Sequence, residues 1–155
     1  MPNLYHVSSN VLSPGQVLQP GQFGQTSRRV NSRGGIPLQG SDAMNLLWEI
    51  ALETARQLLA PEAPSRLHCV FTTLTVPDAI AFRERFRPGS HIYEVLCPDE
   101  IPRHSGNYSA ITDPPDETHV LDFMPDFAIN YWREASEGIT EVLIGGPVTV
   151  VRLVE

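Results

Sequence analysis

The segment that most constrains the fold is residues 140–151, with the sequence TEVLIGGPVTVV. Residues 142–144 and 148–151 are short, largely β-branched apolar runs, a pattern that predicts two buried strands. A Gly-Gly-Pro turn separates them, so we expect a closing hairpin. Glu141 stands at the mouth of the first strand, where partial burial could shift the pKa of its carboxyl group. A solvated residue at an ordinary strand start would have the same sequence signature.

The composition predicts one domain spanning residues 1–155. The chain has 155 residues, of which 41% are hydrophobic, enough to build a real core. A formal net charge of -7 argues against broad, charge-driven binding to DNA or RNA. All 11 basic residues are arginines, which suit bidentate recognition of phosphate or carboxylate groups. The absence of lysine fits a GC-rich genome, and it also fits a toxin that evades lysine-directed tagging in a host cell.

Neither a metal site nor a membrane segment is expected. Cys69 and Cys97 lie in separate expected strands and form no metal-spaced pair, so we expect two buried thiols. The five histidines lack the short spacings that bind zinc. No basic-then-apolar signal pattern opens the chain, and no apolar run approaches transmembrane length. We therefore expect a cytoplasmic protein, or one delivered into a host or target cell, without a signal peptide.

Short strands and unevenly placed helices predict an α+β fold with about three helices. Strands are expected at residues 4–8, 65–73 and 91–96, and a further short strand at 121–123 lies within an otherwise irregular connection over 97–125. Helices are expected at residues 41–60, 77–86 and 127–135, the last capped by Asp126. Residues 21–40 form a long polar loop with several arginines, and such a loop in a compact domain is usually functional or disordered.

The first expected helix has a distinct apolar face. Ser41 provides its N-cap, and Asp42 favours the positive end of the helix dipole. Apolar residues that recur at helical spacing are expected to face the core, and these are Met44, Leu47, Trp48, Ala51, Ala55, Leu58 and Leu59. The polar residues between them are expected to face away from the core, and these are Asn45, Glu49, Glu53 and Arg56.

Taken together, these segments resemble the ADP-ribosyltransferase fold, whose members cleave NAD and transfer its ADP-ribose. Three short motifs carry the resemblance: Tyr5-His6 with Ser8-Ser9, then Val70-Phe71-Thr72-Thr73, then Glu141-Val142-Leu143 before the Gly-Gly-Pro turn. The second motif, with the helix and strand after it, is similar to small antibiotic-modifying members, and the third is similar to toxin-like members. The resemblance implies a single-domain split β-sheet core, with NAD as substrate and no metal.

Within that resemblance, Glu141 is the candidate catalytic carboxylate. Breaking the nicotinamide–ribose bond develops positive charge on the sugar, as in glycoside cleavage, and a fixed carboxylate stabilises that charge. The first motif implies that His6, with Tyr5 and Ser8 beside it, holds the adenosine-side ribose and phosphates. We expect the strands that carry His6, Thr72 and Glu141 to border one cleft, because the carboxylate and the cofactor clamps must contact one bound ligand.

Further residues are candidates for NAD binding. The hydroxyl groups of Thr72 and Thr73 could fix the ribose or order Glu141. Phe23, Phe71 or Tyr93 could stack on nicotinamide, and the sequence does not choose among them. Arg28 and Arg29 could neutralise the pyrophosphate. Each of these residues also has a purely structural explanation. His6 could be a hydrogen-bonded strand residue, Thr72 and Thr73 could be ordinary strand formers, and Arg28 and Arg29 could lie in a solvated loop.

The chain departs from the family at two positions. Val70 stands where histidine-type members often have tyrosine, and Ile139 stands where arginine-modifying toxins have Glu or Gln. Arginine is therefore not an expected target.

The sequence accordingly predicts a glycosyltransferase activity, the NAD-dependent transfer of ADP-ribose to a protein, nucleic acid or small molecule. The chain would act as a toxin or effector, for which an inhibitory partner protein is expected. The alternatives are an NAD glycohydrolase, a catalytically inactive relative that serves as a binding module, and a small ligand-binding module unrelated to NAD.

Overall fold

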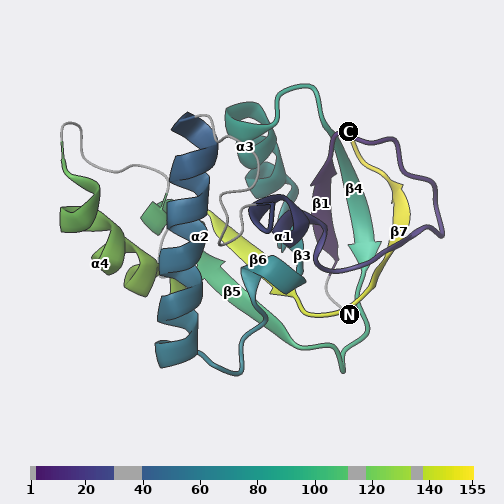
Figure 1. Ribbon diagram of the computed structural model, residues 1–155. Coiled ribbons are helices and arrows are strands. Elements are labelled where there is room, and N and C mark those ends of the chain that lie inside the picture. Colours follow the sequence, from purple (N-terminus) through teal and green to yellow (C-terminus); the bar gives the residue numbers. More distant parts are fainter. Residues whose placement is uncertain (1–2, 30–39, 112–117, 134–137) are drawn as a thin grey trace.

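The computed structural model describes residues 3–29, 40–111, 118–133 and 138–155. Within them, one antiparallel sheet of seven strands forms the centre of the molecule (Figure 1). The strands are β1 (Leu4–Ser8), β2 (Val17–Leu18), β3 (Val70–Thr73), β4 (His91–Leu96), β5 (Arg103–Asn107), β6 (Thr140–Ile144) and β7 (Val148–Leu153). Their order across the sheet is β2-β7-β4-β1-β3-β6-β5.

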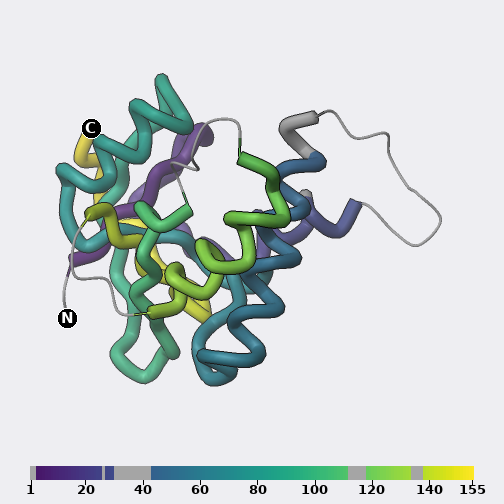
Figure 2. Tube along the Cα trace, turned by 90° about the vertical axis from the view of Figure 1, so that its left-hand side faces the viewer, coloured from purple at the N-terminus to yellow at the C-terminus, as the bar shows by residue number. Residues whose placement is uncertain are grey.

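Four α-helices and two 3-10 turns are described alongside the sheet, so the α+β class is confirmed. The helices are α1 (Gln22–Ser27), α2 (Gly40–Leu59), α3 (Val76–Phe86) and α4 (Val120–Trp132), and the turns are η1 (Arg66–His68) and η2 (Tyr108–Ile111). Helices α2 and α4 lie side by side in both views (Figures 1 and 2), while α3 contacts β1, β3 and β4. Among the described helices, none has the length and apolar character needed to cross a bilayer.

The last two strands do not form the expected hairpin. Strand β6 pairs with β3 and β5, whereas β7 pairs with β2 and β4. The Gly-Gly-Pro segment is therefore a crossover between two distant positions in the sheet. Its close packing explains the glycines: a Cβ at Gly146 would lie 2.9 Å from Ile101 Cγ2, and Gly145 donates its N–H to the carbonyl of Pro102 at 2.8 Å. Short apolar runs predict strands but not their partners.

The junction between β1 and β3 is narrow. Tyr5 and Thr73 are the one register pair between these strands, whereas five pairs join β1 to β4, from Leu4 with Val95 to Ser8 with His91. The sheet thus consists of two parts, β2-β7-β4-β1 and β3-β6-β5, that meet at a single bridge.

The helix α3 follows the sequence prediction closely. Thr75 caps it, because its Oγ1 accepts a hydrogen bond from the Asp78 N–H at 3.2 Å, and proline occupies the first turn. The helix ends at Phe86, as expected. The start of α3 could be predicted because the cap and the proline both act within its first turn.

Four other predictions of local structure are wrong. Helix α4 begins at Val120, so the strand expected at 121–123 is helical, Asp126 lies inside the helix, and Pro125 is accommodated within it. Strand β5 occupies part of the connection that was expected to be irregular. Within the expected polar loop, residues 22–27 form α1, while 30–39 lie outside the described residues. The expected strand at 65–73 starts with the 3-10 turn η1, and β3 covers only its last four residues.

Helix α2 presents only part of its predicted apolar face to the core, since Trp48 and Ala51 pack against buried residues as expected. Leu52 and Ala55 are buried, but Leu47 and Leu58 are exposed, as are Met44 and Leu59. Glu49, which was expected to face solvent, is buried. The side chains of Ser41 and Asp42 lie outside the described part of the structure, so their capping roles stay predictions. The Glu49 side chain points toward the core because it pairs with a buried arginine of η1, Arg66.

Two hydrophobic clusters cover opposite faces of the sheet. One contains Leu4, Val70, Tyr93, Val95, Cys97, Val142, Ile144, Val148 and Val150. The other lies between the sheet and helices α2 and α4, and it contains Leu52, Ala55, Cys69, Ala128, Tyr131, Trp132 and Leu143. Successive strand residues alternate between these faces, which decides where each candidate side chain points.

Candidate active site

The three strands that carry the sequence motifs are neighbours. Strand β3 lies between β1 and β6, and the register places Tyr5 opposite Thr73 and Thr73 opposite Glu141. Directly opposed residues share one face of an antiparallel sheet. Tyr5, Thr73 and Glu141 therefore form a row across the sheet, on the face to which Phe71 and Leu143 also point.

His6 and Thr72 point to the other face. His6 is opposite Tyr93 and Thr72 is opposite Val142, and both partners belong to the first hydrophobic cluster. His6 donates from Nδ1 to the carbonyl of Phe71 at 2.8 Å, and burial lowers the pKa of its imidazole. Thr72 donates to the carbonyl of Val142 at 2.9 Å. The expectation that His6 and Glu141 would line one cleft is therefore wrong, because adjacent residues of a strand alternate in direction.

Glu141 is the centre of a buried polar network. Its residue is only 5% exposed. Its Oε1 accepts hydrogen bonds from Nη1 of Arg66 and, at 2.5 Å, from the hydroxyl of Tyr131. Arg66 Nη1 is also 2.8 Å from the Tyr131 oxygen. Among the described residues, no hydrogen bond reaches Oε2 of Glu141, so one oxygen is clamped while the other keeps its lone pairs.

Arg66 joins Glu141 to helix α2. Its Nε lies 3.2 Å from both carboxylate oxygens of Glu49, and its Nη2 lies 3.2 Å from Oε1 of the same residue. The guanidinium also stacks on two rings, with its Cζ 4.9 Å from the centroid of Phe71 and 5.0 Å from that of Tyr131. Arg66 is only 7% exposed, and these contacts give its guanidinium the hydrogen-bond partners and counter-charges that a buried ion requires.

A glycine makes room for this network. Gly106 of β5 is directly opposite Glu141. A Cβ at this position would lie 2.4 Å from the Tyr131 hydroxyl oxygen, closer than any side chain can approach. Tyr131 can therefore reach across β5 to Glu141 only because residue 106 is glycine.

The charges in the network perturb one another. Burial raises the pKa of Glu141, although Arg66 and the Tyr131 hydrogen bond act in the opposite direction. Burial would lower the pKa of Arg66, but Glu141, Tyr131 and Glu49 outweigh it and raise that pKa well above its ordinary value. Burial also raises the pKa of Tyr131 well above its ordinary value. Arg66 thus stays charged, while burial favours the neutral form of Glu141.

The other candidates on β1 and β3 make local contacts. Tyr5 is half-buried, and Ser8 is buried with its Oγ accepting the Asn10 N–H at 3.1 Å. Thr73 donates its hydroxyl to the carbonyl of Thr75 at 3.0 Å, so it orders the turn into α3.

The two arginines proposed for the pyrophosphate are near the molecular surface. Arg28 donates from Nη2 to Nε2 of His68 at 2.5 Å, and Arg29 is exposed. Phe71 packs edge-on against Phe23, with 5.0 Å between the ring centroids, in addition to its contact with Arg66.

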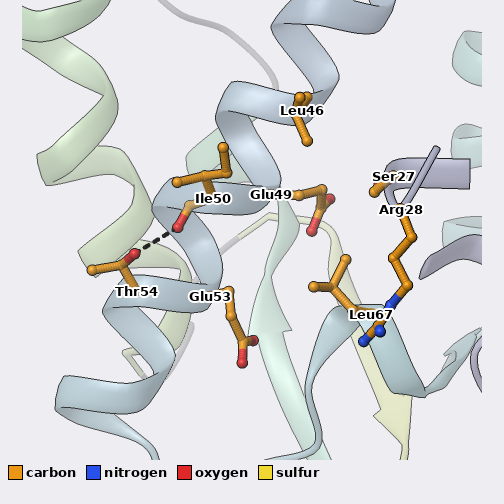
Figure 3. A pocket seen from close by; sticks show the side chains of 8 residues that line it. All are labelled: Ser27, Arg28, Leu46, Glu49, Ile50, Glu53, Thr54 and Leu67. Atoms are coloured by element: carbon orange, nitrogen blue, oxygen red, sulfur yellow. Dashed lines mark hydrogen bonds between the residues drawn. The ribbon is translucent and has the colours of Figure 1, made fainter. Parts of the chain in front are cut away.

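A surface pocket of about 250 Å³ lies beside the network, between α1, α2 and η1. Its lining residues are Ser27, Arg28, Leu46, Glu49, Ile50, Glu53, Thr54 and Leu67 (Figure 3). Figure 3 shows the Glu49 side chain directed from α2 toward Leu67 and Arg28. The carboxylate that holds Arg66 therefore also borders a pocket that opens at the surface.

Sequence reasoning missed Arg66, Glu49 and Tyr131 as members of the site. Arg66 was assigned to a strand, Glu49 to the solvent face of a helix and Tyr131 to apolar packing. The polar residues at 65, 66 and 68 interrupt the apolar strand pattern, which was the one local signal for the turn. No local signal indicates the pairing itself, since Arg66 and Glu141 are 75 residues apart in sequence.

The fold and site define an α+β protein with an antiparallel seven-stranded sheet and a buried ionic network at the start of β6. Residues 5–155 match the family model described as "Protein of unknown function (DUF2441)". The chain belongs to this family. No curated protein matches it.

Proposed function

We propose that the chain is an NAD-dependent ADP-ribosyltransferase whose catalytic carboxylate is Glu141. The observation that carries the proposal is the way Glu141 is held: Arg66 and Tyr131 fix Oε1, while Oε2 accepts no hydrogen bond among the described residues. A carboxylate with one immobilised oxygen and one available oxygen suits a ribose hydroxyl and a developing positive charge.

The position of Glu141 in the sheet supports the same proposal. Glu141 is the second residue of β6, which pairs with the strand of the second motif, β3, and β3 in turn pairs with the strand of the first motif, β1. The single bridge between β1 and β3 agrees with a split-sheet core. Tyr5 and Thr73, which share a row with Glu141, replace His6 and Thr72 as the nearest candidates for ribose contact.

The chemistry follows from these positions. As the bond between nicotinamide and ribose lengthens, positive charge grows on the sugar. Ionised Glu141 stabilises that charge, and its fixed geometry removes the cost of reorganising a solvent shell. The acceptor is a protein, a nucleic acid or a small molecule, or water if the activity is that of a glycohydrolase.

The test is release of nicotinamide from NAD by wild type and by Glu141→Gln. Glutamine keeps the shape but removes the negative charge, so we expect turnover to fall roughly 10²–10³-fold, as is typical when one preorganised electrostatic group is lost. NAD binding, measured by calorimetry, should persist. The matched control is Glu94→Gln, because Glu94 is another buried glutamate of the same sheet but pairs with Arg152, at 2.6 Å. Full turnover by Glu141→Gln would remove Glu141 from the mechanism.

A second candidate is a catalytically inactive binding module of the same fold. It is favoured by the ion pair with Arg66, which neutralises Glu141, and by the burial of both side chains, 8% and 6% exposed. This candidate predicts that wild type binds a ligand or partner but releases no nicotinamide under any condition of pH.

A further inference from the structure

In this site, the guanidinium of Arg66 binds the carboxylates of two residues, Glu49 and Glu141. Glu49 occupies the Nε and Nη2 edge of Arg66, and Glu141 contacts Nη1. The three groups come from separate elements, α2, η1 and β6. If both glutamates are ionised, the buried set carries one uncompensated negative charge. Burial strongly disfavours such a charge, so protonation of one carboxyl group relieves it.

Glu141 shares the guanidinium of Arg66 with Glu49. Burial raises its pKa, and the charge of Glu49 raises it further, in opposition to Arg66. The titratable groups that face it are Arg66 from η1, Glu49 from α2, Tyr131 from α4, and Tyr108 and Cys69 nearby. Burial raises the pKa of both Tyr108 and Cys69, so both stay neutral across the physiological range. Glu49 is thus the single repelling charge in the set.

We propose that Glu49 is a positioning residue that controls, through Arg66, how much of Glu141 is ionised. Glu49 draws the guanidinium toward α2 and divides its charge between two partners. Glu141 consequently receives less stabilisation than a dedicated ion pair would provide. The proposal rests on the proposed function only for its effect on turnover, because the charge coupling can be measured without NAD.

The test is the titration of Glu141 in Glu49→Gln. Difference infrared spectroscopy follows its carboxyl group, assigned as the band that Glu141→Gln removes. Loss of the repelling charge should move the titration midpoint of Glu141 to lower pH. The matched control is Glu53→Gln: Glu53 lies one turn further along α2 and bonds Arg56 and Ser65 instead of Arg66. The control should leave the midpoint unchanged.

Unchanged titration in Glu49→Gln, or an equal shift in both variants, would overturn the proposal. Should the glutamine variant fail to fold, Glu49→Leu removes the same charge with an apolar side chain and should shift the midpoint in the same direction. If wild type releases nicotinamide, the rate of release can be measured against pH for both proteins. The acid limb of this profile should lie at lower pH in Glu49→Gln than in wild type. A shifted titration without nicotinamide release from wild type would support the coupling and refute the proposed function.

Discussion

Replacement of Arg66 by methionine tests the buried network most directly. Methionine retains much of the apolar stem but removes the charge and every hydrogen bond that Arg66 makes to Glu49, Tyr131 and Glu141. Two carboxyl groups, each on a residue only 5% exposed, then lack a counter-ion. Removing one partner of a buried ion pair typically costs about 3–5 kcal/mol. For a chain of this size that corresponds to a fall in melting temperature of roughly 6–20 °C.

The loss should depend on pH. Without Arg66 the folded-state pKa of Glu141 rises further, because its main attracting charge is gone. A carboxyl group whose pKa is raised in the folded state contributes stability that is present below its unfolded pKa, about 4.3, and is lost as the pH rises through the folded value. The difference between wild type and Arg66→Met should therefore be smallest in acid and grow toward neutral pH.

Urea denaturation at several pH values measures both quantities. The control is Arg83→Met, since Arg83 pairs at 3.5 Å with the half-exposed Glu155, and such surface pairs are worth only about 0–1 kcal/mol. A loss in Arg66→Met no larger than in the control, or one that does not change with pH, would refute a buried ionic network.

Two further predictions concern packing around the site. Gly106→Ala should force Tyr131 away from Glu141 and lower the free energy of unfolding by roughly 1–3 kcal/mol, the usual range for overpacking. If urea denaturation shows no loss of stability, Tyr131 does not pass over residue 106. Cys69 and Cys97 are buried and burial raises the pKa of both thiols, so a thiol-specific reagent should label them only as fast as the protein unfolds. Rapid labelling of the native protein would contradict their burial.

The positions of several elements could be predicted because their causes are local. Thr75, Pro77 and Asp78 act within one turn and determine where α3 begins. The apolar runs of β4, β6 and β7 are short and bounded by turn residues, so their existence follows from period and composition. Glu141 was recognised as an unusual charge for the same reason, since it opens a run that is otherwise apolar.

The sequence by itself thus determined the α+β class, the segments that form β1, β4, β6 and β7, and the presence of a charged residue, Glu141, at the start of an apolar strand. Only the tertiary structure decided that β6 and β7 lie in different parts of the sheet, that His6 and Glu141 face opposite sides, and that Glu49 turns inward. The physical reason is that strand partners and ion pairs are contacts between distant residues. Arg66 lies 17 residues from Glu49 and 75 from Glu141. Helical periodicity placed Glu49 toward solvent, but the cost of burying an uncompensated guanidinium outweighed it.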